Sequence, residues 1–258
     1  MQKDTKMNNN NLKIKETFAT ALQNHQRKNF KVAESLYKEI LKTKPNHFES
    51  VFYLGSLLVQ TKNFYKAKQL LQKAIQIQPN FVATHNNLGI VFKELREHKK
   101  AMSHFQKAIE IDPNFKNAHY NLGVAFDKLN EFQKAIGYYE KAIQIDPNYL
   151  GAHNNLGNAF KELGEHKKAI GCYEKVIQID PNNATAHSNL GKILGELNHV
   201  NEAKKYFEKS LNLDPNREKT CEDYGDLLLK LNQHKKALEY LKKGTGFIQF
   251  TQKDFKII

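Results

Sequence analysis

The chain of 258 residues has no Trp, only two Cys, and no apolar run near the ~20 residues that a membrane-spanning helix needs. Two cysteines cannot form the disulfide framework of a small secreted domain. The first residues, Met1 to Leu12, are polar and lack the apolar core of a secretory signal. These absences exclude the membrane and secreted classes. They predict a cytoplasmic, or at least intracellular, protein, and a nuclear location stays open.

The sequence also lacks the signatures of common catalytic sites. It contains no Gly-rich phosphate loop and no GxSxG, HExxH or CxxC motif. We therefore predict that the protein is not an enzyme and needs no cofactor.

Four of the eleven histidines recur every 34 residues, and they are the best candidates for a metal site: His85, His119, His153 and His187. A zinc ion holds its histidine nitrogens at about 2 Å, so its ligands must lie close together. Successive packed helices are on the order of 10 Å apart, so these residues cannot share one metal. We predict that the rings pack between helices and that no metal is bound.

What the sequence does contain is a strict internal period. All six prolines are 34 residues apart and each is followed by Asn: Pro45, Pro79, Pro113, Pro147, Pro181 and Pro215. A fixed period of this length indicates a solenoid. Numbering each unit from 1 to 34, with proline at position 32, position 8 is Gly in six units and position 20 is Ala in all seven.

One unit reads as a pair of helices. From Val82 to Leu95 the large side chains recur at helical spacing, and a second stripe runs from Lys99 to Ile111. Gly at position 8 and Ala at position 20 allow the two helices to approach closely. Proline then ends the unit, and Asn114 is expected to cap the helix that follows.

The spacing of Leu-Gly, Ala, an aromatic residue and Pro resembles the tetratricopeptide repeat (TPR) family. The resemblance implies an all-α solenoid, a right-handed superhelix of about seven helix-turn-helix hairpins. The predicted organisation is a disordered polar segment at 1–13, then an array at 14–251 and an apolar tail at 247–258. The array divides into 14–47, 48–81, 82–115, 116–149, 150–183, 184–217 and 218–251, with the first and last units degenerate. The tail is expected to fold back over Leu227, Leu231 and Leu238.

The net charge of +13 is distributed unevenly. Nine of the thirteen excess positive charges lie in residues 1–81, and the central units are nearly neutral. A nucleic-acid groove needs its basic residues concentrated along the binding face. We therefore predict no specific nucleic-acid binding, and a protein or peptide partner that is acidic where it meets the N-terminal end.

The helix face opposite the core carries the remaining information. On the first helix of each unit, positions 2, 6, 9 and 13 should be exposed, and position 6 is Asn in four successive units. The predicted backbone clamps are Asn87, Asn121, Asn155 and Asn189. The residues predicted to tune selectivity are Asn158, Lys93, Asp127, Lys161 and Lys192. Asparagine is a mediocre helix former, but its amide can both donate to and accept from a peptide backbone.

An asparagine ladder of this kind resembles the arrays of O-linked N-acetylglucosamine transferases, as do Asn86-Asn87-Leu88-Gly89 and the segments from Phe18 to Gln26 and from Tyr37 to Leu41. The resemblance implies a concave groove that binds an extended peptide. We expect a non-catalytic interaction scaffold. The alternative is a substrate-recruiting fragment of such a glycosyltransferase without its catalytic domain.

Overall fold

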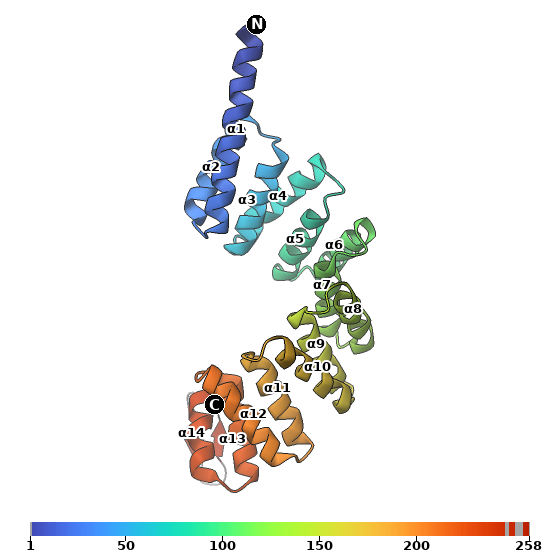
Figure 1. Cartoon of the computed structure of the whole chain (residues 1–258), viewed down its shortest axis with the longest axis vertical. Coiled ribbons are helices and arrows are strands. Elements are labelled where there is room, and N and C mark those ends of the chain that lie inside the picture. The colour runs from blue at the N-terminus through green and yellow to red at the C-terminus, as the bar shows by residue number, and fades with distance from the viewer. Residues whose placement is uncertain (1, 246–247, 251–254, 258) are drawn as a thin grey trace. The chain divides into compact units, whose positions relative to one another are not determined.

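The structure is a computed structural model that describes residues 2–245, 248–250 and 255–257, with side chains from 10 to 244. Within these residues the chain forms fourteen helices and two short strands. It divides into two compact units, Met1–Ala125 and Phe126–Ile258, which are described separately below. Figure 1 shows the helices as successive antiparallel pairs within each unit.

The first unit holds α1 (Gln2–Gln26), α2 (Phe30–Thr43), α3 (Phe48–Gln60), α4 (Phe64–Ile77), α5 (Val82–Glu94), α6 (His98–Ile111) and most of α7 (Lys116–Asp127). The second unit holds α8 (Phe132–Ile145), α9 (Leu150–Glu162), α10 (His166–Ile179), α11 (Ala184–Glu196), α12 (Val200–Leu213), α13 (Glu218–Lys230) and α14 (His234–Thr245). We call the odd-numbered helices A helices and the even-numbered ones B helices. The predicted all-α solenoid of seven hairpins is confirmed.

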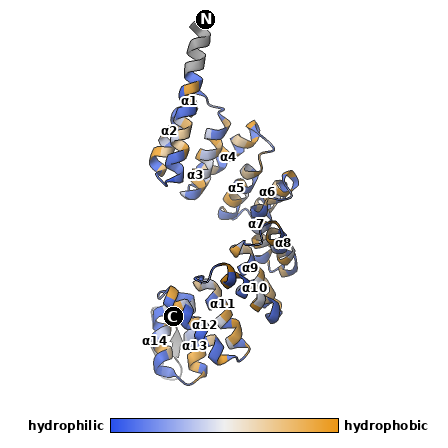
Figure 2. Ribbon diagram, in the orientation of Figure 1, coloured by the Kyte–Doolittle hydropathy of each residue, from blue (hydrophilic) through white to orange (hydrophobic). Residues whose placement is uncertain are grey.

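In five hairpins a glycine of the A helix meets a large side chain of the B helix: Gly55, Gly89, Gly157, Gly191 and Gly225. A Cβ atom added to Gly89 would lie 2.5 Å from the Phe105 ring, and one added to Gly157 would lie 2.6 Å from the Tyr173 ring. Both rings are fully buried. Ala101 and Ala169, on the B helices of the same two hairpins, are also buried. Figure 2 shows apolar and polar residues interspersed along the helices.

The turn between the A and B helices has the same backbone in all seven hairpins. One residue of each turn has a positive φ between 58° and 74°: Lys28, Lys62, Arg96, Asn130, Gly164, Asn198 and Asn232. In the first turn, the N–H of Lys28 donates to the carbonyl of His25 and the N–H of Asn29 donates to the carbonyl of Asn24. These bonds satisfy carbonyls that the end of α1 leaves free, and they require a left-handed residue.

The loop that joins successive hairpins differs from its prediction. Phe115 directly precedes α7, so Asn114 is not the cap. Instead, the Asp112 carboxylate accepts a hydrogen bond from the N–H of Asn114 at 2.9 Å. Asp146 and Asp180 make the same bond to Asn148 and Asn182. Aspartate two residues before the Asn thus closes the turn, a side-chain role that Asp commonly has.

The N-terminal segment also differs from its prediction. Residues 2–13, predicted to be disordered, form the first turns of α1. No Pro or Gly interrupts this stretch, and Ile14 is buried against α2. A helix nucleated by that packing extends toward the N-terminus at little cost, even through Asn residues.

After α14 the structure describes two strands, β1 (Ile248–Phe250) and β2 (Phe255–Ile257). They pair antiparallel, with Ile248 opposite Ile257 and Phe250 opposite Phe255. Residues 247, 251–254 and 258 and the side chains of the tail 247–258 lie outside the described residues. The cover that this tail was expected to give Leu227, Leu231 and Leu238 therefore stays a prediction.

Candidate functional site

The four asparagines of the predicted clamp occupy equivalent positions on four A helices. Asn87 lies on α5 and Asn121 on α7 in the first unit, whereas Asn155 lies on α9 and Asn189 on α11 in the second. All four side chains are half-buried, although the sequence predicted an exposed face. Packing half-buries this face, and three of the amides, Asn87, Asn121 and Asn189, donate hydrogen bonds to the preceding A helix.

In the first unit these bonds link each A helix to the one before it. The Asn87 Nδ2 donates to Ser56 Oγ on α3 at 2.9 Å. The Asn121 Nδ2 donates to Asn86 Oδ1 on α5, also at 2.9 Å. Asn86 is only 5% exposed, so its carbonyl depends on this donor. The asparagines therefore stabilise the stacking of α3, α5 and α7.

The second unit makes a longer version of the same link. The Asn189 Nδ2 lies 3.5 Å from Asn158 Oδ1, and that oxygen also accepts a hydrogen bond from the Tyr173 hydroxyl at 2.8 Å. Asn154, the counterpart of Asn86, has a buried Oδ1 without a partner in the described part of the chain. Asn158 was predicted to tune selectivity, but here it is an acceptor shared by two donors.

Two of these asparagines still have unused hydrogen-bonding capacity. Asn121 and Asn189 each donate once, and among the described residues their Oδ1 atoms accept no hydrogen bond. An amide has two N–H donors and a carbonyl with two lone pairs. Each can therefore still accept from one peptide N–H and donate to one peptide C=O. Because the existing bond orients the amide, little side-chain entropy is lost when it binds.

The charged residues predicted to set selectivity lie toward the C-terminal ends of the A helices. Lys93 pairs with Glu94 at 3.2 Å, and Lys161 pairs with Glu162 at 3.1 Å. Burial, and to a lesser degree Glu162, raises the pKa of Asp127 above its ordinary value. These side chains are not all free to meet a partner, since the two lysines already have carboxylate neighbours.

Lys192 is part of a charged cluster that the sequence only partly revealed. Its Nζ lies 3.2 Å from Asp223 on α13, which also pairs with Lys219 at 3.4 Å. Asp223, Asp226 and Lys230 line the same open hollow as Lys192. Burial and the neighbouring Asp223 raise the pKa of Asp226. Asp226 was missed, although it occupies the same repeat position as Lys192.

Each of the four recurring histidines links its own A helix to the loop before that helix. Their rings are buried, and each Nε2 is 2.8–3.0 Å from the carbonyl of the proline six residues earlier: Pro79, Pro113, Pro147 and Pro181. They pack between helices, as the sequence predicted. In the described part of the chain, no group of three or more His, Cys, Asp or Glu side chains could hold a metal ion.

The two cysteines are free thiols on different hairpins. Burial, with a smaller effect of Glu140, raises the pKa of Cys172 to about 11, and burial also raises that of Cys221. A thiol becomes a nucleophile only as a thiolate, so neither residue is activated at neutral pH.

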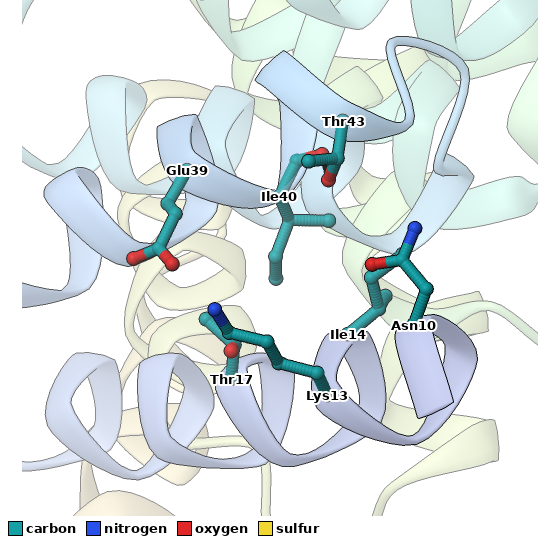
Figure 3. Close-up of a pocket in the computed structure, with 7 residues that line it drawn as sticks. All are labelled: Asn10, Lys13, Ile14, Thr17, Glu39, Ile40 and Thr43. Atoms are coloured by element: carbon teal, nitrogen blue, oxygen red, sulfur yellow. Dashed lines mark hydrogen bonds between the residues drawn. The ribbon is translucent and has the colours of Figure 1, made fainter. Parts of the chain in front are cut away.

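A small hollow lies between α1 and α2 (Figure 3). Ile14 and Ile40 form its apolar part, and Lys13 and Glu39 stand at its rim. Its volume of about 50 Å³ is far below the several hundred Å³ of a typical ligand pocket. It is therefore a packing gap rather than a binding site. Among the described helices, none combines the length and the apolar character needed to span a bilayer.

Profiles of one repeat family match most of the chain. Those described as "Tetratricopeptide repeat" match residues 49–81, 82–115, 117–149, 138–171, 184–217 and 219–247. A profile described as "TPR repeat" matches residues 157–198. No curated protein sequence matches the chain.

Several solved structures share the fold. MamA is 30% identical, with a TM-score of 0.58, over 63% of this chain and 95% of MamA. PilW, a type IV pilus biogenesis factor, is 20% identical with a TM-score of 0.73, over 80% of this chain and 96% of PilW. YrrB, a TPR protein with an unusual peptide-binding site, is 22% identical with a TM-score of 0.56, over 68% of this chain and 91% of YrrB.

Proposed function

Because this chain belongs to the tetratricopeptide repeat family, we propose that it is a non-catalytic scaffold that binds an extended segment of a partner protein. In each compact unit the segment would lie along the A-helix face, where the family resemblance implies a concave groove. The observation that carries the proposal is the unused hydrogen-bonding capacity of Asn121 and Asn189, two amides already oriented by bonds to the preceding A helix.

The recognition would be independent of the partner's side chains. Each asparagine would accept a hydrogen bond from one peptide N–H and donate its second N–H to a peptide C=O. Neighbouring A helices lie about 8–10 Å apart, which corresponds to about three residues of an extended chain. Asparagines on neighbouring A helices of the same unit would thus contact every third peptide unit. A peptide-binding site in the structurally similar YrrB accords with this use of the fold.

Selectivity would come from charged residues beside the asparagines. In the second unit, Lys192, Asp223 and Asp226 offer both signs of charge within one hollow. A partner with a basic residue there would compete with Lys192 for Asp223. Because the Asp223 side chain is only 10% exposed, its carboxylate needs a cationic partner, which a basic residue of the peptide would supply in place of Lys192.

The experiment is a selection of 12-residue peptides from a displayed random library on the full chain, followed by calorimetry with the selected peptides. We expect Asn121→Ala with Asn189→Ala to weaken binding by about 1–3 kcal/mol. The matched control is Asn148→Ala with Asn182→Ala, which removes two exposed amides of the connecting loops. Equal affinity of the two double variants would refute the proposal.

Stability must be measured alongside, because Asn121 and Asn189 also stabilise the array. Each binding measurement is made where circular dichroism shows the variant to be folded. A second readout is a selected peptide N-methylated at every third amide. If the asparagines bind backbone, methylation in one of the three registers should abolish the difference between the wild-type chain and Asn121→Ala. The same should hold, in its own register, for the difference between the wild-type chain and Asn189→Ala.

A further inference from the structure

The A–B turns of the first unit carry residues that their backbone does not favour. Lys28, Lys62 and Arg96 have φ values of 61°, 60° and 61°. The left-handed region costs an ordinary L-residue about 1–2 kcal/mol, and only Gly, and to a lesser extent Asn and Asp, adopt it routinely. In the second unit the same position is Asn130, Gly164, Asn198 and Asn232, which the turn does favour.

The three cations are part of a larger basic surface. Arg27, Lys31 and Lys66 flank them, and all six side chains are exposed. Among the described residues, none of the six takes part in an ion pair, a side-chain hydrogen bond or a cation–π contact. We call these six residues the basic turn edge.

Two of the four A–B turns of the second unit neutralise a nearby lysine with a glutamate of the turn itself. Glu131 pairs with Lys134 and Glu165 pairs with Lys168, each at 2.5 Å. Each of these glutamates directly follows the left-handed residue of its turn. In the first two hairpins that residue is Asn29 or Asn63, which carries no charge. Only the third turn has an acid, Glu97, and it pairs with Lys68 and Lys100 rather than Arg96.

Local electrostatics do not explain the three cations. The C-terminus of an A helix attracts positive charge, but the N-terminus of the next B helix repels it. Since α2 begins at Phe30 and α4 at Phe64, each cation lies two residues from that second terminus. The two effects oppose each other, and the unfavourable φ remains.

A large apolar side chain lies on the same edge. Tyr65, next to Lys66 at the start of α4, is 76% exposed, and Val32, next to Lys31 at the start of α2, is 49% exposed. Tyr and Arg are enriched among the residues that dominate binding energy at protein interfaces. Exposed Tyr and Val therefore supply apolar contact area to a surface whose charges have no partner.

We propose that the basic turn edge, with Tyr65, is a docking surface for an acidic extended segment of a partner protein. It is separate from the asparagine face, so the inference goes beyond the proposed function. The A helices run side by side, which places the three turns along one edge of the first unit (Figure 1). The turns recur at the helix spacing of about 8–10 Å.

This spacing favours a peptide over a nucleic acid. A polyproline-type segment has three residues per turn and rises about 3.1 Å per residue. An acid at every third position would therefore present a carboxylate about every 9 Å on one side. A nucleic-acid strand has a phosphate about every 3.4 Å, which demands a denser row of cations.

The test uses the full chain and a fluorescent peptide of four Glu-Pro-Pro repeats, with four Gln-Pro-Pro repeats as the control. Fluorescence anisotropy should show binding of the Glu peptide that weakens with added salt, and at least tenfold weaker binding of the Gln peptide. The variant Lys28→Asn, Lys62→Asn, Arg96→Asn should bind the Glu peptide at least tenfold more weakly. Its melting temperature should be equal to or higher than that of the wild type, because Asn suits the turn.

A matched variant removes the same charge from the other end of the first hairpin: Lys13→Gln, Lys42→Gln, Lys44→Gln. It should change the affinity less than twofold, and Asn121→Ala with Asn189→Ala should leave the Glu peptide bound. Equal losses in both charge variants, or no binding of the Glu peptide, would overturn the proposal. So would tighter binding to single-stranded RNA or to phosphatidylserine vesicles than to the Glu peptide.

Discussion

The two compact units have the same backbone at their A–B turns but different residues there. In the first unit the left-handed position is Lys, Lys and Arg, whereas in the second it is Asn or Gly. The hydrogen bonds that close the turn are the same, as in Asn63 to Leu58 and His199 to Leu194. The backbone therefore does not depend on having the best residue at this position. The three cations of the first unit therefore stand at a backbone position that costs stability, and the docking surface proposed above would give them a use outside the turn.

The links between successive A helices differ as well. The first unit has Asn121 to Asn86 at 2.9 Å, whereas the second has Asn189 to Asn158 at 3.5 Å and leaves the buried Oδ1 of Asn154 without a described partner. The same repeat position thus forms a tighter link in the first unit. The 34-residue period determines the position of a side chain on its helix. The residues packed around that side chain determine its hydrogen-bond partner.

The largest effect is expected from substitutions at the close approach of the paired helices, a feature that both units share. Gly89→Ala should destabilise the protein by about 2 kcal/mol, since a Cβ there would lie 2.5 Å from the rigid Phe105 ring. Gly157→Ala in the second unit should cost about the same against Tyr173. Urea unfolding followed by circular dichroism measures both.

The control uses two glycines at another helical position of the second unit. A Cβ on Gly137 or Gly171 would meet nothing within 4 Å. Alanine there should stabilise its helix by up to about 1 kcal/mol. If all four substitutions had the same sign, the close approach of the paired helices would not be the reason for glycine.

The next largest effect concerns the hydrogen bonds that Asn121 and Asn189 make to the preceding A helix, and it compares their contributions to stability. Asn121→Ala should cost about 1 kcal/mol, because it leaves the buried Asn86 carbonyl without its donor. Asn189→Ala should cost less than half as much, because its bond is long and Asn158 keeps the Tyr173 hydroxyl. Equal costs in urea titrations would contradict this ranking.

The period made most of the fold predictable. Pro every 34 residues, with Gly and Ala at fixed positions, was enough to place all seven hairpins. These residues act through local sterics, which the sequence displays directly. The helix at residues 2–13 was not predictable in this way, because it depends on the packing of Ile14 against α2.

The candidate site was less predictable for a related reason. The position of Asn121 followed from the period, but its bond to Asn86 depends on how α5 and α7 pack. That packing half-buries a face which the helical wheel alone predicts to be exposed. The left-handed turn residues were visible in the sequence only as Lys28, Lys62 and Arg96. Their φ values were needed to show that these cations are disfavoured where they stand.

A smaller effect is expected when the left-handed turn residues of the two units are exchanged. Lys62→Asn in the first unit should stabilise the protein by about 0.5–1 kcal/mol, because it relieves an unfavourable φ. Asn198→Lys in the second should destabilise it by a similar amount. Thermal unfolding of the two single variants gives both values, and a stability loss in Lys62→Asn would show that the lysine supports the turn itself.

The smallest effect concerns pH and again separates the units. His104 on α6 stacks on Phe92 and lies 3.3 Å from His85, Nδ1 to Nδ1. Burial, and to a lesser degree His85, lowers the pKa of His104 from 6.5 to about 4. In the second unit the equivalent residue is Tyr138, which stacks on Phe126 in the same way and does not titrate in acid.

Because the unfolded His104 takes up a proton at a higher pH than the folded one, acid favours unfolding. The stabilising contribution is complete above pH 6.5 and is lost as the pH falls toward 4. Between pH 7 and pH 6 the wild type should lose about 0.5 kcal/mol more than His104→Tyr, which gives the first unit the aromatic pair of the second. Urea titrations at both pH values measure this difference. If wild type and variant lost the same stability, His104 would be free to protonate in the folded chain, and its stacking on Phe92 would not exclude the charge.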